Sequence, residues 1–243
     1  MRRSRTLVSF RPEHMDKVGP AGRISACALV LLLIALVVVG LVTQVRARDR
    51  DAAVAAAAVA GPPVLTPDGM VRIGSPNAAI VITVTEDAQC ALCRTLESVS
   101  GPVLTALTDR DEIAVDYRLI AIRDRSSTTA YSSRAANASA CVAAADKTRW
   151  PAWRRAVLNR VPAENSAGLG DQELIDLAIG AGIPATPALS ECVTTRRYGA
   201  FVADQTRKAI ADNVTHAPTV RIGATEVGNL TPAGIDAAVA AAR

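Results

Sequence analysis

The pattern of hydrophobic and polar positions divides the chain into an apolar segment near its start and a longer mixed region. Residues 24–45 contain no charged side chain and consist mainly of Leu, Val, Ile and Ala. At about 1.5 Å per residue, a helix of this length crosses a hydrocarbon core of about 30 Å. The pattern therefore predicts one membrane-spanning helix ahead of the mixed region.

The mixed region alternates between strand-like and helix-like patterns. Runs rich in β-branched residues predict a strand and turn at 71–77, one strand at 80–85 and another at 113–120. They also predict two strands around a glycine turn at 217–228. Helical patterns occur at 94–99, 131–147, 150–160, 171–180, 190–211 and 231–242. The order strand, helix, strand around 80–120 favours a parallel pair. The prediction is an α/β fold with a helical insertion at about 126–211.

The same patterns give the expected domain boundaries. The segment after the apolar span is rich in Ala, contains Gly61-Pro62-Pro63 and lacks periodicity, which is typical of a tether. We therefore expect a basic N-terminus at 1–23 and a transmembrane signal anchor at 24–45. An Ala- and Pro-rich linker at 46–68 and one folded domain at 69–243 are expected to follow.

Charge is concentrated at the start of the chain and indicates topology. Nine Arg and Lys residues oppose three acidic residues among the first fifty, whereas the remainder has eighteen basic and twenty acidic residues. By the positive-inside rule, the N-terminus is expected in the cytoplasm and the domain outside it. A cleaved signal peptide is the alternative, although its apolar region is usually shorter, at about 7 to 15 residues. Because the domain is slightly acidic and poor in aromatic residues, nucleic acid is not an expected partner.

The candidate chemistry lies in Cys90-Ala91-Leu92-Cys93, between the predicted strand at 80–85 and the helix that follows. This position places the first sulfur at a helix N-terminus, where free N–H groups and the helix dipole favour a thiolate. Outside the cytoplasm, cysteines are expected to be oxidised or to cycle between redox states. Cys27 lies in the apolar span and is expected to be a small hydrophobic residue there.

Two motifs carry a resemblance to a known family. The first is Glu86-Asp87-Ala88-Gln89-Cys90-Ala91-Leu92-Cys93, and the second is Ala217-Pro218-Thr219-Val220 followed by Ile222-Gly223. They resemble the catalytic motif and the cis-proline loop of DsbA-like thiol-disulfide oxidoreductases in the thioredoxin superfamily. With the order of elements, the resemblance covers residues 71–243. It implies a thioredoxin-like fold with an inserted helical subdomain, here preceded by one N-terminal transmembrane helix.

The resemblance also implies a role for each matching residue. Cys90 corresponds to the exposed nucleophile and Cys93 to the buried thiol that resolves the intermediate. Ala217 and Pro218 correspond to the cis-proline loop that faces them. Exchange proceeds through a mixed disulfide at the nucleophile, so neither a metal nor an organic cofactor is implied.

This chain departs from the family pattern beside the first cysteine. Ala91 and Leu92 replace the usual Pro and His, Tyr or Ser, so neither side chain stabilises a Cys90 thiolate. Val84 stands where many relatives have a buried carboxylate, and Ala217 replaces the usual Thr or Val. The acidic pair at 86–87 is expected to oppose a nearby thiolate. We therefore expect a weaker oxidant than is typical of the family.

The remaining cysteines leave alternatives open. Cys90 and Cys93 are also compatible with a static disulfide, or with half of a zinc site completed by Cys141 and Cys192. Cys141 and Cys192 fall in predicted helices of the insertion. In an oxidising compartment we expect them to form a structural disulfide there, with two free buried thiols as the alternative.

Two interpretations are open for the tryptophans Trp150 and Trp153, and two for His216. Trp150 and Trp153 are three positions apart on one helix face and are expected to pack in the core, with a peptide-binding lip as the alternative. His216, two positions before Pro218, is expected to be a loop residue or to lie near the active site.

The sequence-based hypothesis is a membrane-anchored extracytoplasmic thiol-disulfide oxidoreductase. Its expected substrates are exported proteins that contain cysteines, and a membrane redox partner is expected to reoxidise it. One alternative is a reductase or isomerase of the same fold. The other is a degenerate thioredoxin-fold module that binds partners without turnover.

Overall fold

The structure is a computed structural model that describes residues 20–243, with side chains described at 28–49 and 59–243. It divides into two units, with the boundary between Val54 and Ala55. Most of the predicted basic segment at 1–23 lies outside the described residues, and so does the side chain of Cys27.

Helix α1 (Pro20–Val59) contains the predicted apolar span. Its residues Ala28–Asp49 form a stretch that is long and apolar enough to cross a membrane, by length and composition. The helix does not end where the tether was expected to begin, because the Ala-rich stretch up to Val59 is also helical. Alanine has the highest helix propensity of all residues, which explains why this stretch continues the helix.

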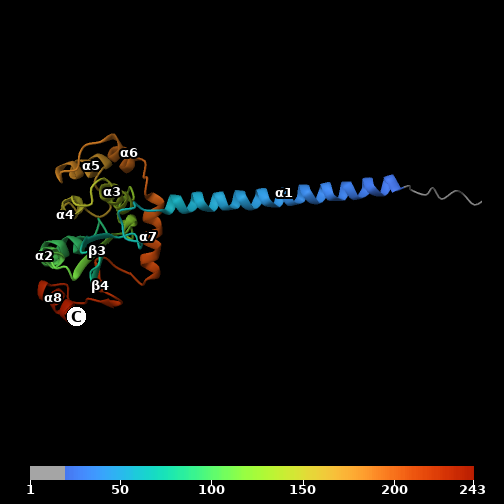
Figure 1. The fold of residues 1–243 in the computed structure, drawn as a ribbon. Coiled ribbons are helices and arrows are strands. Elements are labelled where there is room, and N and C mark those ends of the chain that lie inside the picture. Colours follow the sequence, from blue (N-terminus) through green and yellow to red (C-terminus); the bar gives the residue numbers. More distant parts are fainter. Residues whose placement is uncertain (1–19) are drawn as a thin grey trace, which may run out of the picture. The chain divides into compact units, whose positions relative to one another are not determined.

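A five-stranded mixed sheet forms the centre of the second unit (Figure 1), in the order β1-β3-β2-β4-β5. Its strands are β1 (Val71–Gly74), β2 (Ile80–Glu86), β3 (Ile113–Leu119), β4 (Thr219–Ile222) and β5 (Thr225–Glu226). Strands β2 and β3 are parallel, as the sequence pattern predicts, and the other pairs are antiparallel. Strand β2 is central, so the cysteine motif follows the most enclosed strand of the sheet.

Helices α2 (Ala91–Thr108) and α8 (Pro232–Ala241) pack against each other. Four helices of the insertion gather beside the sheet (Figure 1): α3 (Tyr131–Ala145), α4 (Trp150–Leu158), α5 (Asp171–Gly180) and α6 (Pro187–Thr194). A short 3-10 helix, η1 (Asp124–Ser126), precedes them, and α7 (Gly199–Ala211) follows. The thioredoxin-like α/β fold with a helical insertion is therefore confirmed.

The prediction of one continuous helix over 190–211 was wrong, because the chain breaks between α6 and α7. Arg196 adopts a left-handed backbone with φ 59°. The buried side chain of Asn137 on α3 donates to the carbonyl of Val193 (3.2 Å) and accepts from the backbone N–H of Tyr198 (2.8 Å). These contacts come from a residue more than fifty positions away, so helical periodicity alone does not reveal the break.

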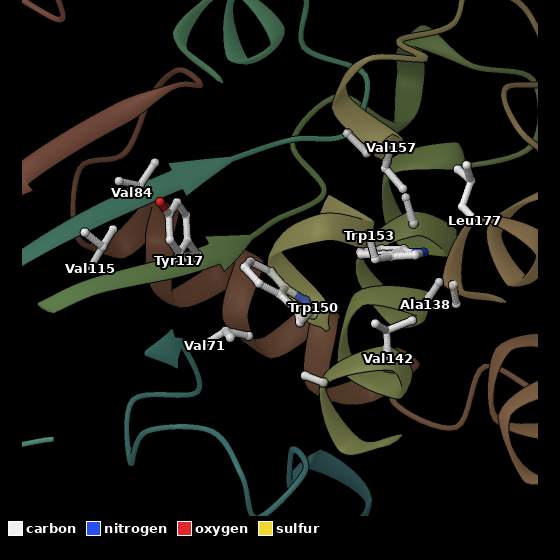
Figure 2. Packing of buried hydrophobic residues seen from close by; sticks show 14 of the residues in the cluster. Val71, Val84, Val115, Tyr117, Ala138, Val142, Trp150, Trp153, Val157 and Leu177 are labelled. Atoms are coloured by element: carbon white, nitrogen blue, oxygen red, sulfur yellow. The ribbon is translucent and has the colours of Figure 1, made fainter. Parts of the chain in front are cut away.

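The core joins the sheet to the insertion through aromatic side chains (Figure 2). The rings of Tyr117 on β3 and Trp150 on α4 lie with centroids 5.6 Å apart. The indole N–H of Trp150 donates to Ser139 Oγ, and that of Trp153 donates to the carbonyl of Leu174. Both indoles are fully buried, so the prediction of core packing is confirmed and neither forms a surface lip.

Cys141 and Cys192 form a disulfide that connects α3 to α6, with Cα atoms 5.9 Å apart. It closes a loop of 51 residues within the insertion. In the chain-entropy model, a loop of this length contributes about 4 kcal/mol of stability.

Candidate active site

The cysteine motif lies on a strand-to-helix turn. Strand β2 ends at Glu86, and Cys90 is the N-cap residue of α2, with an extended backbone (φ −96°, ψ 110°). Its sulfur accepts a hydrogen bond from the backbone N–H of Cys93 at 3.1 Å. Backbone N–H groups in the first turn of a helix have no acceptor within the helix, and the Cys90 sulfur supplies one for Cys93.

The two thiols of the motif differ strongly in acidity. Hydrogen bonds from the Cys93 side chain and backbone lower the pKa of Cys90, and they outweigh the opposing effect of burial. Burial raises the pKa of Cys93, and its contact with the Cys90 sulfur and the charge of Glu86 raise it further. The chain therefore favours a thiolate at Cys90 and a neutral thiol at Cys93, which separates the two roles.

The cis-proline loop lies directly against the first cysteine. The Ala217–Pro218 peptide bond is cis. The thiol of Cys90 donates to the carbonyl of Ala217, with 3.1 Å between Sγ and O. The structure thus brings together the four residues that the sequence assigned to this site, Cys90, Cys93, Ala217 and Pro218. Cys141 and Cys192 lie in the insertion instead, bonded to each other.

Cys90 is less accessible than the family resemblance implied. It is only 3% exposed, because it packs with Cys93, Leu158 and Ala217. The implied description of Cys90 as an exposed sulfur therefore does not hold in this structure. In the reduced form, Cys90 is therefore covered in part by the cis-proline loop.

Asp87 holds the loop that presents the cysteines. Its carboxylate accepts from the backbone N–H of Gln89 (2.9 Å), from Ser132 Oγ (2.6 Å) and from the backbone N–H of Arg123 (2.9 Å). Its carbonyl accepts from the N–H of Cys90 at 3.0 Å. Asp87 therefore connects the active-site turn to α3 and to the loop after β3. Burial raises the pKa of this carboxyl, and its hydrogen bonds oppose that rise.

Glu86 is paired with Arg154 in a buried ion network. Arg154 donates from Nε and Nη2 to both carboxylate oxygens of Glu86, at 2.6 and 2.5 Å, and from Nη1 to Glu97 at 2.6 Å. The guanidinium also stacks over the Tyr117 ring, 4.2 Å from its centroid. Burial acts to lower the pKa of Arg154, but the charge and hydrogen bond of Glu86, together with Tyr117 and Glu97, outweigh it and hold that pKa above its ordinary value.

The acidic pair at 86–87 opposes a thiolate, as expected, because the charge of Asp87 acts to raise the pKa of Cys90 and that of Glu86 acts to raise the pKa of Cys93. Both carboxyl groups are also fully buried and bonded, so they fix the turn as well. The sequence reasoning did not identify Arg154 or Glu97. A signal was available, because Arg154 lies one turn after Trp150 on the apolar face of α4, and a charge on a buried face needs a partner.

An apolar groove of about 570 Å³ opens beside the cis-proline loop. Leu92 and Val99 line it from α2, His216 and Pro218 from the loop, and Leu230 from the segment before α8. Leu92 is 67% exposed, so the second residue of the dipeptide adds apolar surface to the groove. His216 is a loop residue and also lies at this site. Among the described residues, no cluster of three or more His, Cys, Asp or Glu is arranged to hold a metal ion.

Comparison with known proteins decides the family. A family model described as thioredoxin matches residues 65–241. The reduced disulfide bond oxidoreductase DsbG of Mycobacterium tuberculosis is 31% identical, with a TM-score of 0.62, over 72% of this chain and 87% of that one. The chain belongs to the DsbA-like branch of the thioredoxin family.

Other solved DsbA-like proteins show the same fold. Oxidised DsbA of M. tuberculosis is 30% identical, with a TM-score of 0.59, over 72% of this chain and all of that one. MdbA of Corynebacterium diphtheriae, a thiol-disulfide oxidoreductase, is 22% identical with a TM-score of 0.61, over 75% of this chain and 93% of that one. No curated protein sequence gives a significant match.

The lowered pKa of Cys90 predicts the pH dependence of its alkylation. Iodoacetamide reacts with the thiolate, so the rate should rise with pH and level off with a midpoint below about 8.5, the value of a free thiol. In Cys93→Ala, the loss of one hydrogen bond to the sulfur should move the midpoint upward. Mass spectrometry of the modified peptide against pH measures both. A midpoint at or above that of a free thiol would contradict the described hydrogen bonding.

Proposed function

We propose that this protein is a membrane-anchored thiol-disulfide oxidoreductase that exchanges disulfides with exported proteins through Cys90 and Cys93. The observation that carries the proposal is the pairing of a thiol of lowered pKa with a buried thiol of raised pKa, beside the Ala217–Pro218 loop. DsbG of M. tuberculosis, which is 31% identical, is a disulfide bond oxidoreductase, which is the same class of activity.

In the oxidase direction, the reaction starts from the Cys90–Cys93 disulfide. A substrate thiolate attacks Cys90 Sγ, forming a mixed disulfide and releasing Cys93, which takes up a proton because its thiol form is favoured. A second substrate thiolate then attacks the substrate sulfur of the mixed disulfide. The substrate leaves oxidised, and Cys90 leaves as a thiolate that the hydrogen bonds from Cys93 stabilise. Two electrons pass to the protein in each cycle.

The apolar helix at Ala28–Asp49 supports the anchored location. We propose that the charge asymmetry around it keeps the N-terminus in the cytoplasm and the domain outside. A membrane partner that accepts the two electrons would then be held close to the domain. The sequence-predicted parts, with the anchor at 24–45 and the domain at 69–243, are part of this proposal.

The assay for the proposed function is oxidative refolding of reduced RNase by the full chain in non-ionic detergent, beside reduction of insulin by dithiothreitol. We expect catalysis in at least one of the two. Background rates in both would contradict the proposal and favour a module that binds without turnover.

The direction of electron flow is tested in cells by alkylating free thiols and resolving the two forms by gel mobility. We propose an oxidase and expect the Cys90–Cys93 pair to be mainly oxidised. A pair that is mainly reduced would instead indicate a reductase or isomerase.

The groove predicts a role for Leu92 in substrate affinity. Burial of this side chain against an apolar substrate residue contributes about 1 kcal/mol after ordering costs, so Leu92→Ser should raise KM about threefold to tenfold with kcat nearly unchanged. Ile210→Ser is the matched control, since Ile210 is 57% exposed on α7 and does not line the groove. Equal KM values for the two variants would exclude the groove as a substrate contact.

A further inference from the structure

A second cavity, separate from the cysteine groove, lies on the α7 side of the sheet and has a volume of about 610 Å³. Strand β3 contributes Arg118 to it, β4 contributes Arg221, and β2 contributes Thr83 and Thr85. The strand register places Thr85 opposite Arg118 and Thr83 opposite Arg221. Side chains that are opposite each other in neighbouring strands share one face of the sheet, so the two arginines lie on either side of the threonine pair.

Arg118 is buried with few partners. Its side chain is 9% exposed, and its nearest carboxylate, Asp212, lies 3.8 Å away and is itself 61% exposed. Its Nη2 lies 3.5 Å from Thr85 Oγ1, which is the outer limit of a hydrogen bond, and its Nε has no acceptor. A buried guanidinium with unmatched donors is costly, so it is usually paired with an anion. Burial lowers the pKa of Arg118, with Asp212 opposing this effect.

Arg221 adds a second unmatched donor to the same cavity. Its Nε is also buried without an acceptor. Its other nitrogens donate to the backbone carbonyls of Asp212 and Asn213, and Nη2 lies 3.5 Å from Glu226. Two of the six buried unpaired side-chain atoms in the described part of the chain therefore belong to arginines that line one cavity.

The charges that line the cavity nearly balance, so unmatched donors and not a net charge favour an anion there. The lining holds Arg118, Arg221 and Lys208 beside the carboxylates of Asp68 and Asp212. Lys208 is already paired with Asp204 on its own helix, at 2.9 Å. The two arginines are thus the cations with donors to spare, and an arginine fork matches the oxygens of a phosphate group in geometry and charge.

We propose that this cavity binds a phosphate group, between Arg118 and Arg221 and above the hydroxyls of Thr83 and Thr85. A phosphate presents oxygens in several directions, which suits donors that come from three neighbouring strands better than a planar carboxylate does. The cavity is larger than a phosphate ion alone, so it has room for the organic part of an ester. The source is either free phosphate or the headgroup of an anionic phospholipid. The inference does not depend on the redox activity proposed above.

Isothermal titration calorimetry of the full chain in non-ionic detergent tests the site, with chloride at matched ionic strength as the reference. The probes are inorganic phosphate and dihexanoyl phosphatidylglycerol below its micelle concentration. We expect saturable binding of at least one probe, weakened about tenfold or more in Arg118→Gln and in Arg221→Gln. Arg207→Gln is the matched control, because Arg207 is 67% exposed on α7 and does not line the cavity.

The results of these titrations distinguish a free phosphate from a lipid headgroup, and they also show whether the proposal fails. Tighter binding of inorganic phosphate would identify a free phosphate as the ligand, and tighter binding of phosphatidylglycerol would identify a lipid headgroup. Absence of saturable binding of either probe by the wild type would overturn the proposal. Equal affinities for Arg221→Gln and Arg207→Gln would overturn it as well, and this comparison holds even if the buried Arg118→Gln variant fails to fold.

Discussion

Replacement of Arg154 by alanine should lower the free energy of unfolding by about 3 to 5 kcal/mol. Arg154 is the only described cation bonded to the fully buried carboxylate of Glu86, and it also bonds to buried Glu97. Removing it leaves a buried carboxylate without its cation directly before the cysteine turn. That cost arises from the unpaired charge and exceeds the net contribution of the ion pair itself. Urea unfolding followed by circular dichroism measures it.

Arg155→Ala is the matched control for this prediction. Arg155 follows on the same helix and also bonds to Glu97, at 3.0 Å, but its side chain is 54% exposed. An exposed ion pair contributes about 1 kcal/mol or less, so this variant should unfold at nearly the same urea concentration as the wild type. If the two variants lose equal stability, the buried network does not support the turn in the way described.

Cys90→Ser should reduce disulfide exchange to the uncatalysed background. The serine hydroxyl can still cap α2, so the fold should be retained, but it neither forms a disulfide nor ionises at neutral pH. Because every exchange step passes through a bond to the Cys90 sulfur, no partial activity is expected. The RNase and insulin assays measure the loss, and thermal unfolding confirms that the variant is folded.

A double variant, Cys141→Ala with Cys192→Ala, distinguishes the two cysteine pairs. These residues form the disulfide between α3 and α6 and are expected to contribute stability only. Below its own unfolding temperature, the double variant should keep most of the exchange activity. Loss of exchange activity in the folded double variant would contradict this assignment of the two pairs. Retention of exchange activity in Cys90→Ser would contradict it as well.

Local patterns in the sequence were sufficient to predict the framework of the fold. The β-branched run at 80–85 became the central strand β2, and the parallel pairing with β3 follows from the strand, helix, strand order. The C-x-x-C position predicted a sulfur at a helix N-terminus, and Cys90 is the N-cap of α2. These features depend on residues that are close together in the chain, so a sequence pattern records them.

Features that depend on distant contacts were missed or misjudged. The break between α6 and α7 depends on Asn137, and the acidic pair at 86–87 is bonded by Arg154 and Ser132, which come from other helices. The burial of Cys90 depends on the Ala217 loop, more than a hundred residues later. The charge of a side chain was visible in the sequence, but its partner and its solvent exposure were not.

Trapping of partners on Cys93→Ala tests the central claim most directly. Without the resolving thiol, a substrate bonded to Cys90 cannot be released by attack from Cys93, so mixed disulfides should accumulate in cells. The account predicts that peptide mapping by mass spectrometry will find these partners bonded to Cys90, and that they will be exported proteins with cysteines. Absence of mixed disulfides, or their attachment to Cys141 or Cys192, would contradict it.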